Sequence, residues 1–268
     1  MSAAQVALPM YLGAPRAVQN LWTLLRKALQ EHGLHGLPNA VVWPQDLHAH
    51  WLAPTLLLSQ TCGYPLTHGL KGQVQLLGCF RYTAPGCEGI ECRSVFIARQ
   101  EHKDLLLADF RNRLVAFNSA DSQSGYNALR AAVAPLAQGS KFFAAALETG
   151  SHRGSVDAVR ERRADLASID CVTWALLQTH DAPATQGLCA IGHSAPYPGL
   201  PLITALSTPP EQVQALRTCL RGLITAPAAA NSLAQLLISD FETPDLAVYQ
   251  KCIDMETSAI DSGYPRLP

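Results

Sequence analysis

A serine, a histidine and an aspartate in the middle of the chain have side chains that could do chemistry together. Ser122, His152 and Asp170 are the residue types of a hydrolytic triad, in which the histidine accepts the proton of the serine hydroxyl. Cys171 or Cys62 could act instead as a thiol nucleophile. The G-x-S-x-G motif, which marks the serine turn of α/β-hydrolases, does not occur in the sequence. The residue types alone therefore leave catalysis open as an alternative to binding.

The stretch around Ser122 favours binding. Residues 121–130 read DSQSGYNALR, in which polar residues and a glycine precede an expected helix. The first turn of a helix leaves backbone N–H groups unpaired and carries about half a positive charge. Serine hydroxyls add donors, and Gly125 allows a ligand to approach the backbone closely. Such a helix start can bind an anionic oxygen group without a lysine or an arginine, although an ordinary N-cap by Asp121 or Ser122 is the alternative.

The composition indicates a well-buried globular protein without an electrostatic footprint for large anionic partners. Of the 268 residues, 48% are hydrophobic and 15% are charged, and the net charge is −1. A near-neutral chain offers no extended basic surface to nucleic acid or to an anionic membrane. The basic run at Arg160, Arg162 and Arg163 is interleaved with acids, which is typical of a solvated helix face.

The N-terminal residues and the apolar runs bear on localisation. Residues 1–5 lack the basic start of an export signal, and no apolar stretch approaches the roughly 18 residues of a membrane span. As written, the sequence predicts a soluble cytoplasmic protein with no direct membrane insertion. The protein would be periplasmic if a leader was removed before this numbering begins.

The cysteines and histidines show no spacing typical of a metal site. The eight cysteines lie mostly in apolar runs, where reduced thiols behave as small hydrophobic side chains. The pair at Cys87 and Cys92 is a poor zinc half-site, and the pair at His48 and His50 has no nearby third ligand. We therefore expect no metal and no cofactor.

Strands are predicted to alternate with helices along the chain. Expected strands cover residues 5–11, 40–43, 55–61, 73–80, 93–100, 113–118, 165–170 and 187–194, and a return segment begins at residues 201–207. Expected helices cover residues 15–32, 125–137, 155–164, 171–180, 209–225, 232–239 and 246–256. This alternation predicts an α/β fold with mostly parallel sheets, in which ligands bind at the carboxyl ends of the strands.

Three motifs within this pattern resemble a known family. They are S-x-S-G-Y at residues 122–126, S-H-x-x-S-x-x-A-V at 151–159 and A-D-x-A-x-x-D at 164–170. In this order and spacing they resemble the substrate-binding proteins of phosphate, phosphite and phosphonate ABC transporters. The resemblance runs from about residue 8 to at least residue 206.

The resemblance implies a type II periplasmic-binding-protein fold, with two α/β lobes that close by a hinge around a ligand in the cleft between them. Lobe one would comprise residues 1–95 and 200–268, and lobe two residues 96–199. The implied function is reversible binding of a small anionic, phosphonate- or phosphate-like ligand, as the solute-binding component of an ABC transporter. We expect a monomer that works with an ABC permease and catalyses no reaction.

The family pattern also implies which residues contact the ligand. The expected contacts are Gln60, Thr61, Tyr82, Ser122, Gln123, Ser124, Gly125, His152 and Asp170. Contact between His152 and an anion would favour the protonated imidazole, so that affinity would fall as the pH rises. Asp170 occupies the position that faces the distal end of the ligand.

Gln123 departs from the family pattern, which has a small hydroxyl residue at this position. A glutamine would occupy part of the anion pocket or present its amide to a larger group, so a carboxylate or another small polar anion is an alternative ligand. Two other functions stay open: a cytoplasmic ligand sensor of the same fold, and a cysteine-dependent enzyme on a binding-protein fold.

Overall fold

The structure is a computed structural model that describes residues 4–11 and 13–268. Residues 1–3, with which the predicted first lobe begins, and residue 12 lie outside the described residues. The chain forms two compact units, each made of two segments. Unit 1 comprises Met1–Thr83 and Gly199–Val248, and unit 2 comprises Ala84–Pro198 and Tyr249–Pro268.

The two units differ from the predicted lobes at two segments and at Gly199, which was expected in lobe two and lies in unit 1. Residues 84–95 and 249–268 were expected in lobe one, whereas their contacts place them in unit 2. The final helix, α10 (Gln250–Asp261), is held there by polar contacts with α4 (Ala128–Ala137). Arg130 donates to the Glu256 carboxylate at 3.0 Å and is itself buried. These partners are far apart in the sequence, so no local pattern predicts them.

Unit 1 contains a five-stranded mixed sheet of order β1-β2-β11-β3-β12. The strands are β1 (Gln5–Ala7), β2 (Leu56–Gln60), β3 (Val74–Tyr82), β11 (Pro201–Ala205) and β12 (Ile238–Glu242). Strand β11 is antiparallel to both of its neighbours, β2 and β3. It directly follows the point at which the chain returns to unit 1.

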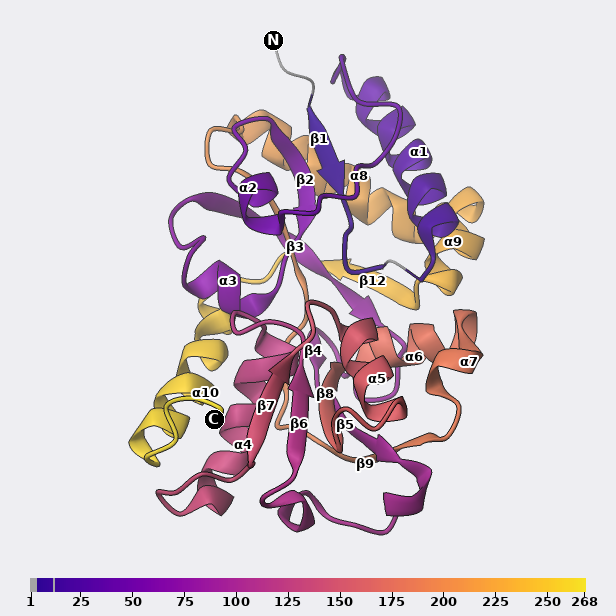
Figure 1. Cartoon of the computed structure of the whole chain (residues 1–268). Helices are drawn as coiled ribbons and strands as arrows, with labels where there is room; N and C mark the ends of the chain where they lie inside the picture. Colours follow the sequence, from indigo (N-terminus) through magenta and orange to yellow (C-terminus); the bar gives the residue numbers. More distant parts are fainter. Residues whose placement is uncertain (1–3, 12) are drawn as a thin grey trace. The chain divides into compact units, whose positions relative to one another are not determined.

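The helices of unit 1 cover this sheet with apolar faces. They are α1 (Pro15–Glu31), α2 (Leu47–Trp51), α3 (Gly63–Thr67), α8 (Pro210–Thr225) and α9 (Ala230–Gln235), with the short helices η4 (Pro227–Ala229) and η5 (Leu246–Tyr249). Helix α1 begins at Pro15, which suits the first turn, and buries Leu21, Trp22 and Leu25. It packs against α8 and α9 (Figure 1).

Unit 2 contains a second five-stranded mixed sheet, of order β7-β6-β8-β5-β9. Its strands are β5 (Ser94–Arg99), β6 (Leu114–Phe117), β7 (Ala145–Glu148), β8 (Leu166–Asp170) and β9 (Leu188–His193). Strands β7, β6 and β8 are parallel, whereas β5 is antiparallel to β8 and β9. A two-stranded sheet pairs β4 (Glu91–Cys92) with β10 (Tyr197–Pro198).

Helices cover both faces of the unit 2 sheet. The long ones are α4, α5 (His152–Arg160), α6 (Cys171–His180) and α10, and the short ones are η1 (Gln100–His102), η2 (Leu107–Phe110), η3 (Gln123–Asn127) and α7 (Ala182–Thr185). Helices α4 and α10 lie on one face, and α5 and α6 on the other (Figure 1). Alternate residues of the strands therefore face different helices, which is why Phe96 and Val115 share one core cluster with Leu129 of α4.

Three sequence predictions about the elements were wrong. Residues 40–43 form no strand, although the Val42 amide donates to the Val6 carbonyl at 2.8 Å. The predicted helix at residues 232–239 ends early, and β12 begins within it because Leu237 adopts a positive φ of 57°. The sheets are mixed rather than mostly parallel, since β5 and β11 each run against their neighbours.

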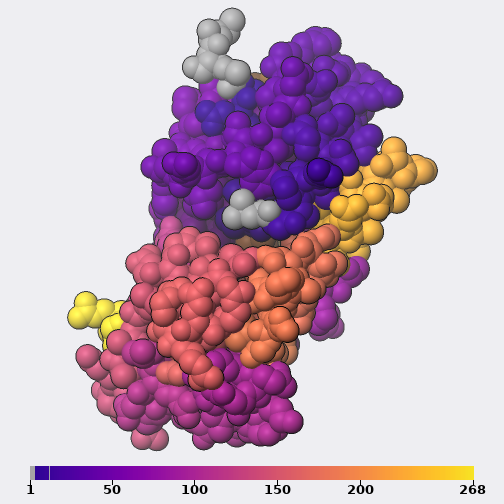
Figure 2. All heavy atoms as spheres, turned by 45° about the vertical axis from the view of Figure 1, so that its right-hand side comes forward, coloured from indigo at the N-terminus to yellow at the C-terminus, as the bar shows by residue number. Residues whose placement is uncertain are grey.

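The basic run on the surface of unit 2 is exposed to solvent and paired with acids as predicted, but only Arg160 lies in a helix. Helix α5 ends there, and Arg162 adopts a positive φ of 62°. Helices α5 and α7 lie side by side there (salmon to orange in Figure 2). Each arginine contacts an acid: Arg160 with Asp157 at 2.7 Å, Arg162 with Glu101 at 2.9 Å, and Arg163 with Glu161 at 2.9 Å. Exposed pairs of this kind contribute little to stability. Among the described residues, no helix is long and apolar enough to cross a membrane.

Candidate anion-binding site

The carboxyl ends of three parallel strands in unit 2 meet at one edge of the sheet. Strand β6 leads into the π-helical turn η3 and then α4, β7 leads into α5, and β8 leads directly into α6. Three helix starts therefore gather at this edge, as expected for a ligand site in an α/β sheet. They carry six of the predicted contacts: Ser122, Gln123, Ser124, Gly125, His152 and Asp170.

The turn η3 depends on a glycine. Ser122 caps it, and its Oγ accepts a hydrogen bond from the Gly125 amide at 3.0 Å. A Cβ atom at position 125 would lie 1.8 Å from Asn118 Oδ1, a separation that no pair of heavy atoms tolerates. Glycine is therefore required here by the close approach of Asn118. The sequence predicted a regular helix from residue 125, whereas a π-helical turn precedes α4.

Ser124 is held in place through its backbone and its hydroxyl. Its carbonyl accepts hydrogen bonds from Ser94 Oγ at 2.8 Å and from Ser168 Oγ at 2.6 Å. Its own Oγ lies 2.8 Å from His152 Nε2 and 3.4 Å from Ser122 Oγ. The two serine hydroxyls and the imidazole thus form one short polar chain, although they come from two different helix starts.

His152 is neutral near pH 7 in this arrangement. Burial lowers the pKa of its imidazole to about 4, because a charged ring would lose its hydration. Its Nδ1 is buried and has no hydrogen-bond partner among the described residues. A hydrolytic triad would place a carboxylate there, whereas Asp170 Oδ1 accepts from the Thr173 amide at 2.8 Å. The expectation of a protonated imidazole concerns the anion-bound protein and stays a prediction, whereas the imidazole of the ligand-free protein is neutral.

The Gln123 side chain is held by contacts within unit 2. Its Oε1 accepts from Asn127 Nδ2 at 2.8 Å, and its Nε2 lies 3.2 Å from Met255 Sδ in α10. Asn127 in turn donates to the Cys252 carbonyl at 2.8 Å. The glutamine amide therefore joins η3 to α10. The sequence suggested that this amide either fills the anion pocket or selects a larger ligand. These contacts give it a structural role, and its contact with a ligand stays a prediction.

We expect Gln123→Ser to lower stability while leaving ligand affinity nearly unchanged. The substitution removes the hydrogen bond with Asn127, which is worth about 1–2 kcal/mol when a buried partner is left unsatisfied. Urea unfolding would measure the loss of stability, and calorimetry with a confirmed ligand would measure affinity. An affinity change of more than about tenfold, equivalent to 1.4 kcal/mol, would show that Gln123 contacts the ligand after all.

Asp170 caps the third helix start. It is 3% exposed, and burial, with a smaller contribution from the adjacent Cys171, raises the pKa of its carboxyl to about 7. Among the described residues, its Oδ1 accepts from Thr173 as the N-cap of α6. The alternative nucleophile Cys171 is 1% exposed and lies next to other thiols, and Cys62 precedes α3 in unit 1.

The remaining predicted contacts lie together in unit 1. Gln60 ends β2, Thr61 follows it, and Tyr82 ends β3. Gln60 Nε2 donates to Tyr82 Oη at 3.1 Å, and the Tyr11 hydroxyl also forms a hydrogen bond with that of Tyr82. Gln60 Oε1 and Thr61 Oγ1 are buried and have no partner among the described residues. Buried polar atoms of this kind are uncommon and are typical of sites that a ligand completes.

The structure adds residues that the sequence analysis missed. Asn118 constrains Gly125, Ser94 and Ser168 fix the backbone of Ser124, and Tyr11 joins the Gln60–Tyr82 pair. Of these residues, only Ser168 lies within one of the three sequence motifs, so only Ser168 could have been suspected from the sequence. His50 is also buried, and its ring nitrogens bond Gln5 at 2.9 Å and Ser59 at 3.0 Å, so its role is structural.

Comparison with known proteins identifies the class. The two α/β units and their mixed sheets define a type II periplasmic binding protein, which confirms the predicted fold class. The family model for the periplasmic phosphonate substrate-binding proteins of ABC transporters matches residues 82–249, more than half of the chain. The chain belongs to this family of binding proteins, as its motifs suggested. A search of curated protein sequences gave no match.

Solved structures share the fold at low sequence identity. PhnD1 from Prochlorococcus marinus, in complex with methylphosphonate, aligns with a TM-score of 0.76 and 14% identity, over 97% of this chain and 98% of its own. A binding-protein component of the ABC phosphonate transporter of Pseudomonas aeruginosa has a TM-score of 0.73 and 17% identity, over 97% and 88%. XAC2383 from Xanthomonas citri, bound to chloride ion, has a TM-score of 0.71 and 15% identity, over 97% and 99%.

Proposed function

We propose that the protein reversibly binds a small phosphonate- or phosphate-like anion through the helix start at residues 122–125. One observation carries the proposal. Ser122 Oγ accepts a hydrogen bond from the Gly125 amide, and Ser124 Oγ lies 2.8 Å from His152 Nε2. If the neutral imidazole carries its proton on Nε2, both serine oxygens accept internal bonds. Each hydroxyl hydrogen can then donate to an anionic oxygen in place of the long 3.4 Å contact between the two serine hydroxyls.

The electrostatics of this helix start suit an anion held by neutral groups. Backbone N–H groups and the helix dipole supply partial positive charge, and hydrogen bonds to charged oxygens are stronger than neutral ones. His152 orients the Ser124 hydroxyl rather than supplying a charge of its own. Asp170 would face the distal end of the ligand, where its carboxylate suits an amino group.

In this proposal unit 1 supplies the remaining contacts. Gln60, Thr61 and Tyr82 would bind the ligand on closure, and the buried unpartnered atoms of Gln60 and Thr61 support this role. Affinity would then be coupled to a hinge motion, with no bond made or broken. The protein would act as a monomer that passes its ligand to an ABC permease, in keeping with the periplasmic family to which it belongs.

The proposal is tested by ligand screening followed by Ser124→Ala. Thermal shift should identify a ligand among phosphate, phosphite, alkylphosphonates, aminoalkylphosphonates and small carboxylates, since a hundredfold excess over Kd stabilises by about 2.7 kcal/mol. Ser124→Ala should then weaken binding by about 1–3 kcal/mol in calorimetry, because it removes a charge-assisted hydrogen bond.

Ser140→Ala is the matched control, because this serine is also in unit 2 and its hydroxyl bonds only the Ala137 carbonyl among the described residues. Its affinity should equal that of the wild type. Unchanged affinity in Ser124→Ala would refute the assignment of the helix start. A carboxylate as the only ligand found would refute the phosphonate-like class.

A further inference from the structure

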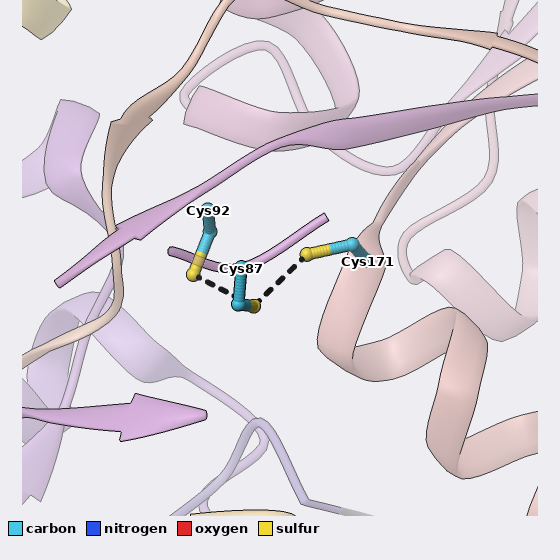
Figure 3. A group of neighbouring side chains, drawn as sticks. All are labelled: Cys87, Cys92 and Cys171. Carbon is cyan, nitrogen blue, oxygen red and sulfur yellow. Dashed lines mark hydrogen bonds between the residues drawn. The ribbon is translucent and has the colours of Figure 1, made fainter. Parts of the chain in front are cut away.

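Three cysteine side chains meet in unit 2, beside Asp170 of the candidate site. Cys87 Sγ lies 3.5 Å from Cys92 Sγ and 3.4 Å from Cys171 Sγ, and all three sulfurs lie within 4.8 Å of one another (Figure 3). Cys87 and Cys92 come from one loop, and Cys171 is the first residue of α6. The sequence analysis considered only the pair Cys87 and Cys92, because Cys171 is distant from them along the chain.

The backbone holds this cluster from both sides. A tight turn closes the loop through mutual hydrogen bonds of 2.9 Å between the backbones of Glu88 and Glu91. Cys92 pairs with Tyr197 in the two-stranded sheet, and the Cys171 amide donates to the Arg93 carbonyl at 3.2 Å. The positions of the sulfurs are therefore set by secondary structure rather than by a free loop.

Gly86 permits the close approach of the loop to α6. It has a φ of 99°, in the region that favours glycine, and a Cβ atom there would lie 3.3 Å from Cys171 Cβ and 3.5 Å from its Sγ. A side chain at position 86 would press against the third thiol. Glycine at position 86 therefore leaves room for the Cys171 side chain.

The spacing of the sulfurs fits a metal ion. With two edges of 3.4 and 3.5 Å and a third of at most 4.8 Å, the point equidistant from the sulfurs lies about 2.0–2.4 Å from each, which matches a metal–thiolate bond of about 2.3 Å. A disulfide would need a contraction to about 2.05 Å and would leave one sulfur unused.

The surroundings favour at least one thiolate. Cys171 lies at the N-terminus of α6, where the helix dipole stabilises a negative charge. Cys92 and Cys171 are 2% and 1% exposed, and the half-buried Cys87 leaves a path for an ion to enter.

We propose that Cys87, Cys92 and Cys171 form a binding site for one thiophilic metal ion, Cu(I) or Zn(II), in the reduced protein. Soft thiolate ligands select these ions. Three ligands complete a trigonal Cu(I) site, whereas Zn(II) would need a fourth ligand from solvent on the side of Cys87. Binding releases the remaining thiol protons to solvent and changes no oxidation state. The ion would tie the loop at residues 86–92 to the start of α6.

The test uses the full chain, purified and stripped with a chelator under anaerobic, reducing conditions. Zn(II) and Cu(I) are titrated separately against chromophoric chelators, and Co(II) serves as a spectroscopic probe that reports thiolate ligation. We expect one equivalent of Cu(I) or Zn(II) and thiolate-to-cobalt charge-transfer bands. Each of Cys87→Ser, Cys92→Ser and Cys171→Ser should bind roughly a hundredfold more weakly.

Two further variants separate the loss of a metal ligand from a general loss of folding. Cys189→Ser removes a thiol of unit 2 outside the cluster and should bind as the wild type does. Gly86→Ala keeps all three ligands and should weaken binding by displacing the loop. Three outcomes would overturn the proposal: no ion bound by the reduced protein, undiminished binding by Cys171→Ser, or a disulfide at Cys87 in protein purified anaerobically.

Discussion

Gly125→Ala should be among the most damaging single substitutions in unit 2. The new methyl group would lie 1.8 Å from Asn118 Oδ1 and 3.0 Å from its Cγ, so either the buried Asn118 side chain or the turn η3 must move. Overpacking of this kind lowers stability by about 1–3 kcal/mol, and we expect the upper end of that range. Because Ser122 and Ser124 flank this glycine, a displacement of about 1 Å should also weaken anion binding by about a hundredfold.

Urea unfolding and calorimetry would separate these two effects. Asn118→Ala in the same chain removes the Oδ1 atom and should restore most of the stability lost by Gly125→Ala. Gly222→Ala is the control, since a Cβ atom at this position in α8 meets no heavy atom within 4 Å. If the double variant were no more stable than Gly125→Ala, the contact with Asn118 would not be the reason for the glycine.

Acid should destabilise the ligand-free protein through His152. Its pKa is about 4 in the folded state and 6.5 in the unfolded chain, so the unfolded chain binds more protons between these values. The contribution of His152 is complete above pH 6.5 and is lost progressively as the pH falls to 4. At 1.36 kcal/mol for each unit of pKa shift, the loss amounts to about 3 kcal/mol.

The measurement compares unfolding free energies of the wild type and His152→Gln between pH 4 and pH 7.5. Asp170 has a raised pKa and acts in the opposite direction, losing stability as the pH rises toward 7, so the wild-type curve alone would be shallow. The difference between the unfolding free energies of the two proteins gives the pH-dependent contribution of His152 alone. Ser140→Ala, which removes no titratable group, should run parallel to the wild type. A difference curve independent of pH would mean that the imidazole is hydrated.

Much of the candidate site was predictable from local patterns. Ser122 was identified because polar residues and a glycine precede an expected helix, and Asp170 because it occupies a position of the family pattern at the end of an expected strand. Both side chains accept a hydrogen bond from the helix that they cap. Strand order and strand direction were less predictable. Strands β5 and β11 run against their neighbours, and no local pattern encodes the direction of a partner strand.

The sequence by itself determined the alternation of strands and helices, the family, and the helix start that we propose as the anion site. Periodicity and capping act over a few residues, so these features can be deduced from neighbouring positions. Only the tertiary structure decided that Gln123 contacts α10, that Asn118 requires a glycine at position 125, and that Cys171 joins Cys87 and Cys92. Each of these depends on the packing of distant segments, which brings side chains together without a trace in the local pattern.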